Sequence, residues 1–438
     1  MLWISTPVPY ALPKVFDALS PCTNPLFWLD SAAPESDKDA RSLLSLDARL
    51  LRRVNADEIE APWSVLDADV ARFRARYPQC PTGLVAWLSY ESGFLGKSYA
   101  HSPSPIPMVE IYELRAALVE TQRGVELVTL GVTAEDARKQ QAHWLEALRR
   151  RVETPEVELA AVSSLVMRDG GSRAEYIAGI ERILQAVDAQ ELAQVCLTYP
   201  ITFERPERMD LLYRTLREIA PAGYCAFVRT TSLECASTSP ECLFVVEGQR
   251  VLAQPMKGTR RRGEQPDALL AEELRNNPKD RSENAMIAQL LRDELQSICL
   301  PNTVKITKPF EVQVFANVLQ MISTVEGELH KELGPFHVFA TLAPPGSMTG
   351  YPKEKACEML DGLEPQARGL YSGSIAWLDG AGRSVFSVVI RSLQAFDDHA
   401  SWHVGGGIVA GSQPDEEWEE SRAKAATLLE SPGLVRGS

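Results

Sequence analysis

Short apolar runs separated by tight turns fill the C-terminal third of the chain. The runs cover residues 374–378, 384–396 and 401–404, and the turns between them lie at 379–382 and 397–398. Turns this short join neighbouring antiparallel strands, because a parallel pair needs a much longer crossover. The pattern therefore predicts an antiparallel sheet with separate helices, an α+β fold and not a doubly wound parallel one.

Helical segments accompany these strands and suggest a division of the chain into two parts. Helical spacing of apolar residues is clearest over 267–298, and further helices are expected over 134–152, 172–187 and 414–429. The irregular stretch from 153 to 172 is the expected linker, since it contains Pro155 and a Gly-Gly pair. A chain of 438 residues is long enough for two lobes, which we place at 1–152 and 172–432.

Charge and cysteine usage exclude several classes of protein. The net charge of -14 argues against a nucleic-acid partner, and no apolar stretch approaches the length needed to span a membrane. The eight cysteines form no CxxC pair, and neither they nor the six histidines have the spacing of a zinc site. The first residues also lack the pattern of a signal peptide. We therefore expect a cytoplasmic protein whose cysteines are small buried side chains.

Two pairs of acidic residues lie three apart in predicted helices. Asp280 and Glu283 form one pair and Glu417 and Glu420 the other, so the members of each pair share a helix face. If both faces lined one cleft, four carboxylates would repel each other unless a divalent cation lay between them, and oxygen ligands favour Mg²⁺ over Zn²⁺. In a chain with 59 acidic residues, the spacing alone favours two solvated faces.

One lysine lies where a strand-like run ends in small residues. Lys257 precedes Gly258 and Thr259, and three arginines follow at 260–262. A lysine at such a turn becomes a nucleophile if it loses its proton. In isolation the run is more typical of a surface turn, so its interpretation depends on the rest of the chain.

Four further features suit the binding of a small anionic ligand. Glu241, at the start of a predicted strand, is placed for general acid or base work. The triple glycine 405–407 follows a strand but lacks the rest of a dinucleotide-binding unit, so it predicts backbone lying close to a ligand. The turn 345–350 precedes a helix whose amides could hold a carboxylate, and Arg391, in a strand of alternating character, suits a bidentate carboxylate contact.

Eight short runs occur along the second part of the chain in the order found in one enzyme family. They lie at 239–241, 256–260, 279–284, 322–325, 345–353, 371–375, 390–393 and 405–409. Over about 172–430 the chain resembles the chorismate-utilising enzymes, which include anthranilate, aminodeoxychorismate, isochorismate and salicylate synthases. The run 87–91 resembles the N-terminal lobe of the same family. The resemblance implies the fold of anthranilate synthase component I, a two-lobed antiparallel β-sandwich with outer helices.

The resemblance also implies a metal site and a set of substrate contacts. Mg²⁺ would be held by Glu283 and Glu420, with Asp280 and Glu417 in or near its shell, and would bind the ring carboxylate of chorismate. The expected substrate-binding residues are Gly258, Thr259, Thr349, Tyr371, Arg391, Gly406, Lys424 and Gln194.

In the mechanism that the resemblance implies, Lys257 attacks the ring while Glu241 protonates the departing hydroxyl, and ammonia then replaces the lysine.

Two positions distinguish the members of the family from one another. Gln194 stands where the water-adding members carry a lysine base, which favours the ammonia-using branch. Lys257 stands where anthranilate synthases resemble Pro-Ile-Ala-Gly-Thr, and a lysine there marks aminodeoxychorismate synthase component I, which serves p-aminobenzoate and folate synthesis. Gln320 departs from the family, which commonly has His at that position.

The source of ammonia and the alternatives remain open at this point. No glutamine amidotransferase signature surrounds any cysteine, so we expect a separate glutaminase subunit, with free ammonia as the other source. The nearest alternative is anthranilate synthase component I. An alternative of another class is a non-catalytic, metabolite-binding regulatory subunit, supported only by Gln320 and by Asp293-Glu294, which departs from the family's usual Asn-Asp. The resemblance also suggests a tryptophan pocket that includes Ser31, where an ordinary turn is the competing interpretation.

Overall fold

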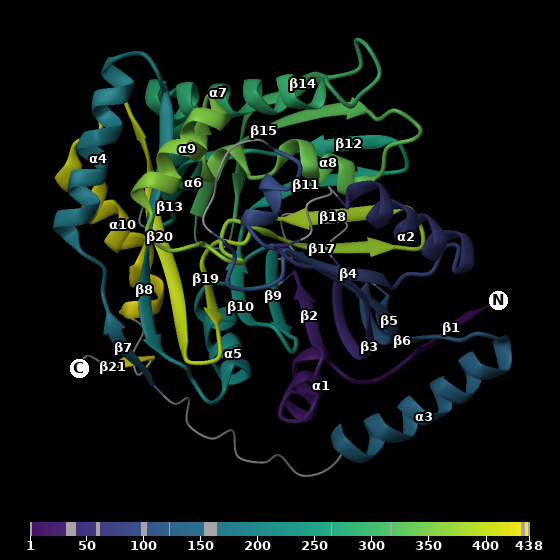
Figure 1. Ribbon diagram of the computed structural model, residues 1–438. Helices are drawn as coiled ribbons and strands as arrows, with labels where there is room; N and C mark the ends of the chain where they lie inside the picture. The colour runs from purple at the N-terminus through teal and green to yellow at the C-terminus, as the bar shows by residue number, and fades with distance from the viewer. Residues whose placement is uncertain are drawn as a thin grey trace.

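A computed structural model describes residues 2–31, 41–57, 62–97, 103–121, 123–152, 164–263, 265–315, 318–430 and 434–436. Strands occupy the middle of the molecule and helices its outside, with the two ends of the chain on opposite sides (Figure 1). Among the described strands, every pairing is antiparallel except that of β7 (Leu165–Asp169) with β21 (Val435–Arg436). The α+β prediction is therefore confirmed, and so is the expected antiparallel sheet.

The strands form two long arms that meet at the pairing of β3 (Ser42–Val54) with β5 (Val109–Thr121). The first arm continues from β3 through β2 (Leu26–Asp30), β9 (Tyr224–Arg229), β10 (Glu234–Ser239), β19 (Ser392–Ala395) and β20 (His399–Val409) to β8 (Gln194–Glu204). The second continues from β5 through β4 (Gly83–Leu88), β17 (Ser374–Asp379), β18 (Arg383–Ser387), β11 (Cys242–Glu247) and β12 (Arg250–Ala253) to β15 (Val318–Glu328). At the far end of this arm, β15 also pairs with β13 (Met256–Arg261) and β14 (Lys305–Val314). The first part of the chain adds β1 (Trp3–Pro7) and β6 (Gly124–Leu130), and β16 (Gly350–Tyr351) pairs with β8.

Both arms contain strands from each side of the predicted linker. β2 joins the first part of the chain to β9, and β4 joins it to β17. The division at 1–152 and 172–432 stays a prediction, and residues 153–163 of the linker lie outside the described residues. What the pairing establishes is that the two parts share their sheets.

Alternating side chains of the first arm pack into two different apolar cores. Phe27 of β2 and Val228 of β9 belong to a core that also contains Trp87 and Phe386 of the second arm. The next residues along, Trp28 and Phe227, belong to a core with Phe16 of α1 (Leu12–Leu19) and Tyr213 of α5 (Met209–Ile219). Because side chains of a strand alternate between faces, the first arm is covered by the second arm on one face and by helices on the other.

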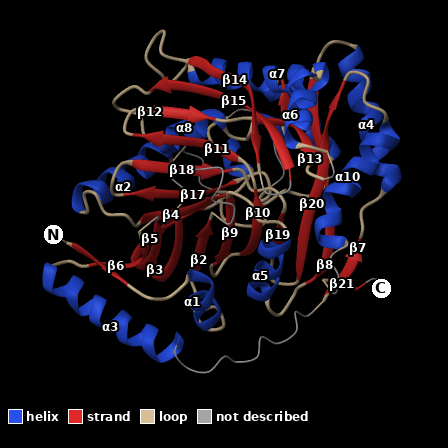
Figure 2. Ribbon diagram, turned by 180° about the vertical axis from the view of Figure 1, so that it is seen from behind, coloured by secondary structure: helices blue, strands red, loops and turns tan. Residues whose placement is uncertain are grey.

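The remaining helices cover the outside of the two arms. They are α2 (Trp63–Arg76), α3 (Ala134–Val152), α4 (Arg173–Asp188), α6 (Asp267–Asn276), α7 (Pro278–Leu295), α8 (Pro335–Leu342), α9 (Lys353–Leu363) and α10 (Pro414–Leu429). In Figure 2 α10 and α4 lie beside β20 and β8, while α6 and α7 lie near β13 and β15. No helix of the described residues has both the length and the apolar character needed to cross a membrane.

Three sequence predictions about local structure need correction. The helix expected over 267–298 is two helices, because Asn277 caps α7 by accepting a hydrogen bond from the Asp280 amide and Pro278 begins it. The strand expected over 384–396 breaks into β18 and β19, and Arg391 lies between them with φ of 50°. The triple glycine lies inside β20 and not after a strand. Of the cysteines, Cys22 is exposed and the other seven are buried.

Candidate functional site

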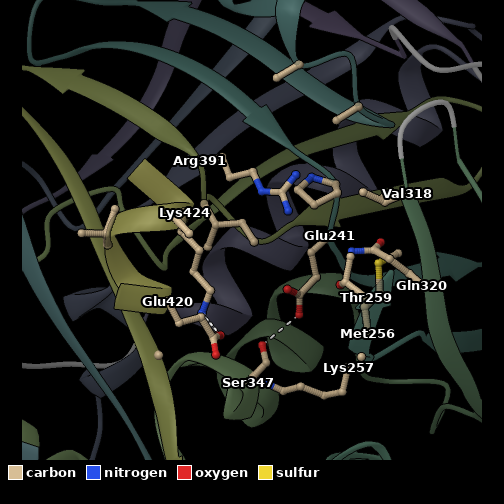
Figure 3. A pocket seen from close by; sticks show the side chains of 18 of the residues that line it. Glu241, Met256, Lys257, Thr259, Val318, Gln320, Ser347, Arg391, Glu420 and Lys424 are labelled. Carbon is tan, nitrogen blue, oxygen red and sulfur yellow. Dashed lines mark hydrogen bonds and ion pairs between the residues drawn. The ribbon is translucent and has the colours of Figure 1, made fainter. Parts of the chain in front are cut away.

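A cavity of about 1370 Å³ opens between β13, β20, α10 and the first turns of α7. Figure 3 shows its interior, where Glu241 lies between Arg391 and Lys257. The cavity brings together side chains that lie far apart in the sequence. The predicted site residues that line it are Glu241, Lys257, Gly258, Thr259, Asp280, Glu283, Tyr371, Arg391, Gly406, Glu417, Glu420 and Lys424.

Lys257 reaches the cavity because its strand carries a bulge. β13 pairs Met256 with Ile322 and Thr259 with Gln320, so β13 has one more residue than β15 between these two pairs. Gly258, at φ of 81°, supplies the left-handed conformation that such a bulge uses. A Cβ at residue 258 would lie 2.9 Å from the Asp280 side chain, so only glycine lets the bulge approach α7. The sequence predicted a tight turn at Gly258, and the structure has a β-bulge inside a strand there.

Glu241 is a buried carboxyl with a single hydroxyl donor. It lies between β10 and β11, and the Ser347 hydroxyl donates a hydrogen bond to its Oε1 over 2.8 Å. Burial raises the pKa of Glu241, although Lys257, Ser347 and Arg391 each act to lower it. A carboxyl that retains its proton to higher pH is suited to general acid work. Lys257 extends on the Ser347 side of this carboxyl (Figure 3).

The four predicted metal ligands form what we call the acidic end of the cavity: Asp280, Glu283, Glu417 and Glu420. Asp280 and Glu283 lie in the first two turns of α7, and Glu417 and Glu420 in the first two turns of α10. The partial positive charge at the N-terminus of a helix stabilises carboxylates there. The structure thus places both acidic helix faces in one cavity, which spacing alone did not favour.

Each carboxylate of the acidic end has a different electrostatic setting. Asp280 is paired with Arg260 at 3.0 Å, and the Ser412 hydroxyl donates to Glu417 over 2.6 Å. Glu420 is paired with Lys424 at 2.9 Å, and this cation holds the pKa of Glu420 below its usual value.

Glu283 differs from the other three, because it has neither an ion pair within 4 Å nor a side-chain hydrogen bond among the described residues. Burial raises the pKa of Glu283, and Asp280 and Glu420 raise it further, while Lys257 and Lys279 lower it. Its two acidic neighbours therefore act on it through space even without direct contact.

The acidic end supplies the right ligand atoms for Mg²⁺, but its carboxylates do not converge on one position. Carboxylate oxygens are the ligands that Mg²⁺ prefers, so the residues present fit this ion. Within the described part of the chain, however, no three acidic, histidine or cysteine side chains lie close enough together to hold one metal ion. Asp280 and Glu420 are turned toward Arg260 and Lys424 instead. Coordination by both helices would require these ion pairs to open.

Arg391, Tyr371, His403 and Arg261 form what we call the arginine end of the cavity. Burial lowers the pKa of Arg391, and Arg261 lowers it further, while Glu241 raises it. The accessible surface of Arg391 faces the cavity, which is why the side chain is exposed and yet surrounded by protein. Tyr371 is enclosed and its ring stacks on His403, with centroids 4.8 Å apart and planes 20° apart.

Three predicted residues do not line the cavity. Thr349 is fully buried and its hydroxyl donates to the Pro345 carbonyl. Gln194 is buried behind Gly407, and neither its amide oxygen nor its amide nitrogen has a hydrogen-bond partner among the described residues. Ser31 follows β2, and its amide donates to the Ser42 hydroxyl. Ligand contacts by these residues remain predictions.

Several residues that line the cavity were not predicted as site residues, and those that bear on its chemistry include Ser347, Lys279, Arg261 and His403. The turn 345–350 was considered for its amides, and the structure adds a side-chain hydroxyl directed at Glu241. Arg261 belongs to a basic run that is visible in the sequence. Its neighbours Arg260 and Arg262 form ion pairs, whereas the side chain of Arg261 points to the other face of the strand, and the sequence did not show this difference. His403 carried no signal in the sequence, because a lone histidine in a strand is usually a core residue.

Residues 24–430 match the family described as chorismate binding enzyme. The aminodeoxychorismate synthase of Streptomyces griseus is 30% identical over 97% of this chain and 63% of its own length. Anthranilate synthase component 1 of Geobacillus stearothermophilus is 34% identical over 65% of this chain and 57% of its own length. The chain thus spans about three-fifths of the length of these relatives. The crystal structure of anthranilate synthase component I from Streptococcus pneumoniae has a TM-score of 0.76 at 21% identity, covering 88% of this chain and 91% of that one, which confirms the predicted fold. Because the family match extends over most of its length, the chain belongs to the chorismate binding enzymes.

Proposed function

We propose that this chain is the synthase component that converts chorismate and ammonia to 4-amino-4-deoxychorismate. The observation that carries the proposal is the position of Lys257, which a bulge turns into the same cavity as Glu241 and the acidic end. Its charge acts on three carboxylates, those of Glu241, Glu283 and Glu420. The aminodeoxychorismate synthase of Streptomyces griseus supports the assignment, since its similarity extends over nearly the whole chain.

The proposed reaction has two steps, and both use residues of this chain. The neutral amine of Lys257 adds to ring carbon C2, the ring double bonds shift, and the 4-hydroxyl leaves as water with the proton of Glu241. Ammonia then adds at C4, the bonds shift back and the Lys257 amine departs. The released protons return to Glu241 and Lys257. The net change exchanges ammonia for water, so atoms and charges balance.

The two ends of the cavity hold the two carboxylates of the substrate in this proposal. Glu283 and Glu420 would hold Mg²⁺ with help from Asp280 and Glu417, and the ion, when bound, neutralises the ring carboxylate and draws electrons from the ring. The Gly258 amide supports the ring carboxylate. Arg391 and Tyr371 bind the carboxylate of the enolpyruvyl side chain.

We further propose that ammonia comes from a separate glutamine amidotransferase subunit. The lone pair that attacks C4 belongs to neutral ammonia, which is a minor species at neutral pH. Delivery by a glutaminase bound to this chain would raise its local concentration. Activity with ammonium salts alone should therefore appear only at high concentration and alkaline pH, whereas glutamine plus the partner should support it near neutrality.

A second candidate function is that of anthranilate synthase component I. The relative from Geobacillus stearothermophilus supports it, because that anthranilate synthase component 1 is 34% identical over 65% of this chain. Anthranilate forms with loss of pyruvate, so the two candidates give different products from the same substrates.

The test is to identify the product formed from chorismate, Mg²⁺ and ammonium by mass spectrometry and fluorescence. We expect 4-amino-4-deoxychorismate, no pyruvate release, and a lysine adduct on the intact protein when ammonia is withheld. Lys257→Ala should abolish turnover and the adduct, whereas Lys355→Ala, an exposed lysine of α9, should change neither. Anthranilate as product would establish the second candidate. Chorismate binding without turnover, even with a glutaminase present, would point to a regulatory subunit.

A further inference from the structure

His403 occupies the arginine end of the cavity next to the expected anchor of the substrate. It lies in β20, one residue beyond Trp402, which pairs with Leu393 of β19. One step along this register brings His403 beside Ser392, the immediate neighbour of Arg391. Arg391 lies just before β19 with a left-handed backbone, and its side chain and that of His403 line the same cavity. The two residues therefore reach the cavity from β20 and from the segment that leads into β19.

The imidazole of His403 is almost enclosed and makes no hydrogen bond to the described residues. The residue is 5% exposed, and the Nδ1 atom is buried without a partner. Its ring stacks on Tyr371, which fixes the plane in which its nitrogens lie. Because Nδ1 is enclosed by the protein, the ring nitrogen left for a ligand in the cavity is Nε2.

The protonation state of His403 follows from its surroundings. Burial lowers the pKa of His403 to about 3, and the nearby guanidinium of Arg368 contributes in the same direction. The ring is therefore neutral at physiological pH and carries one proton. Since Nδ1 is enclosed with no acceptor near it, the proton belongs on Nε2, the nitrogen on the cavity side. The wall of the cavity that contains the charged Arg391 thus also offers one uncharged donor.

We propose that His403 is a substrate-binding residue that donates its Nε2 hydrogen to the side-chain carboxylate of the substrate, together with Arg391. This rests on the proposed function, because it assumes a substrate whose second carboxylate reaches the arginine end. A neutral donor adds direction without adding charge, so it selects for a planar carboxylate in a fixed orientation. The stack with Tyr371 holds the donor in place before the substrate arrives.

Variants of His403 can separate the contribution of its hydrogen-bond donor from that of its ring, which stacks on Tyr371. His403→Asn keeps a donor near the position of the ring, while His403→Leu has a similar volume and no donor. His403→Phe keeps the stack on Tyr371 and also lacks a donor. We expect Leu and Phe to raise the KM for chorismate about tenfold, with kcat and the KM for ammonium nearly unchanged, since a hydrogen bond to a charged group is lost. Asn should stay within about threefold of the wild type.

Binding measurements keep this test separate from the question of the reaction. The dissociation constant of chorismate, measured by calorimetry with Mg²⁺ on each full-length variant, should follow the same order whichever product the enzyme makes. Chorismate methylated at the side-chain carboxylate should bind the wild type and His403→Leu alike. If Phe behaves as the wild type while Asn and Leu are both impaired, only the stack matters and the proposal is wrong. Equal chorismate binding by all variants would also overturn it. Thermal unfolding identifies any variant that fails to fold, and the remaining donor and non-donor variants then decide.

Discussion

The two ends of the cavity hold charge in opposite ways. At the acidic end, Asp280 and Glu420 are paired with cations of the chain itself, and Glu417 accepts from Ser412. At the arginine end, neither Arg391 nor Arg261 has an ion-pair partner within 4 Å among the described residues. Two of the four carboxylates at the acidic end are paired with cations of the chain, whereas the arginine end retains unpaired positive charge.

This difference indicates which end must change when ligands bind. A metal ion at the acidic end competes with Arg260 and Lys424, so binding there exchanges one set of ion pairs for another. A carboxylate at the arginine end meets guanidinium groups that have no ion-pair partner among the described residues, and Tyr371 and His403, stacked on each other, line the same end. The arginine end is therefore prepared for its ligand in advance, and the acidic end is assembled by it. The substitutions below test each end, in order of expected effect.

Glu283→Gln should have the largest effect, because Glu283 is the acid that has neither an ion pair nor a side-chain hydrogen bond among the described residues. Losing the metal at this site removes the charge stabilisation of the ring carboxylate, which we expect to lower kcat/KM roughly a thousandfold, equivalent to about 4 kcal/mol. The measurement is a Mg²⁺ titration of activity for the wild type and the variant. Glu416→Gln, an exposed acid of α10, is the matched control. An unchanged Mg²⁺ dependence in Glu283→Gln would remove this residue from the metal shell.

Glu241, between the two ends, should control the alkaline side of the pH profile. Burial raises its pKa, so the protonated acid persists to higher pH than a solvated glutamate would allow. Activity should fall as pH rises through this raised value, because the departing hydroxyl then loses its proton donor. Glu241→Gln should lower kcat by a factor of about 10² and remove this limb of the profile. A profile of the same shape in both proteins would show that another group titrates.

Arg391→Gln should weaken chorismate binding at the arginine end. A charged hydrogen bond contributes about 1.5 to 3 kcal/mol, so we expect kcat/KM to fall about 10- to 100-fold, mainly through KM. Arg261→Gln is the comparison, and its effect should be smaller because Arg261 is exposed on the strand edge. Were Arg261→Gln the more damaging of the two, the main anchor would be at the mouth of the cavity instead.

Arg260→Gln should have the smallest effect and the opposite sign. Removing this partner frees Asp280, so Mg²⁺ should bind about two- to threefold more tightly, as expected for the loss of a partly exposed ion pair. The measurement is the Mg²⁺ concentration that gives half-maximal activity. Arg262→Gln is the control, because Arg262 is paired with Asp267 outside the acidic end. A weaker midpoint would mean that Arg260 organises the acidic end and does not compete with the ion.

The sequence alone determined the local features of this protein. Short turns predicted antiparallel pairing, and the strands of the first arm confirm it. The helix that begins at Pro414 was predicted within a residue, because Pro and acidic side chains mark a helix start. The eight short motifs identified the family, because each is a contiguous stretch of the chain and can be recognised without knowing what it contacts. Those properties depend on neighbours in the chain and are therefore visible in it.

Only the tertiary structure decided how these pieces meet. The two acidic helix faces begin more than a hundred residues apart, and nothing in their spacing distinguished a shared cavity from two solvated surfaces. The pairing of Asp280 with Arg260 and the stacking of His403 on Tyr371 likewise join residues from different strands and helices. The bulge at Gly258 requires the register of β13 against β15, which a single strand does not carry. Packing between distant segments sets these contacts, because burial and charge depend on what surrounds a side chain in space and not on its neighbours in sequence.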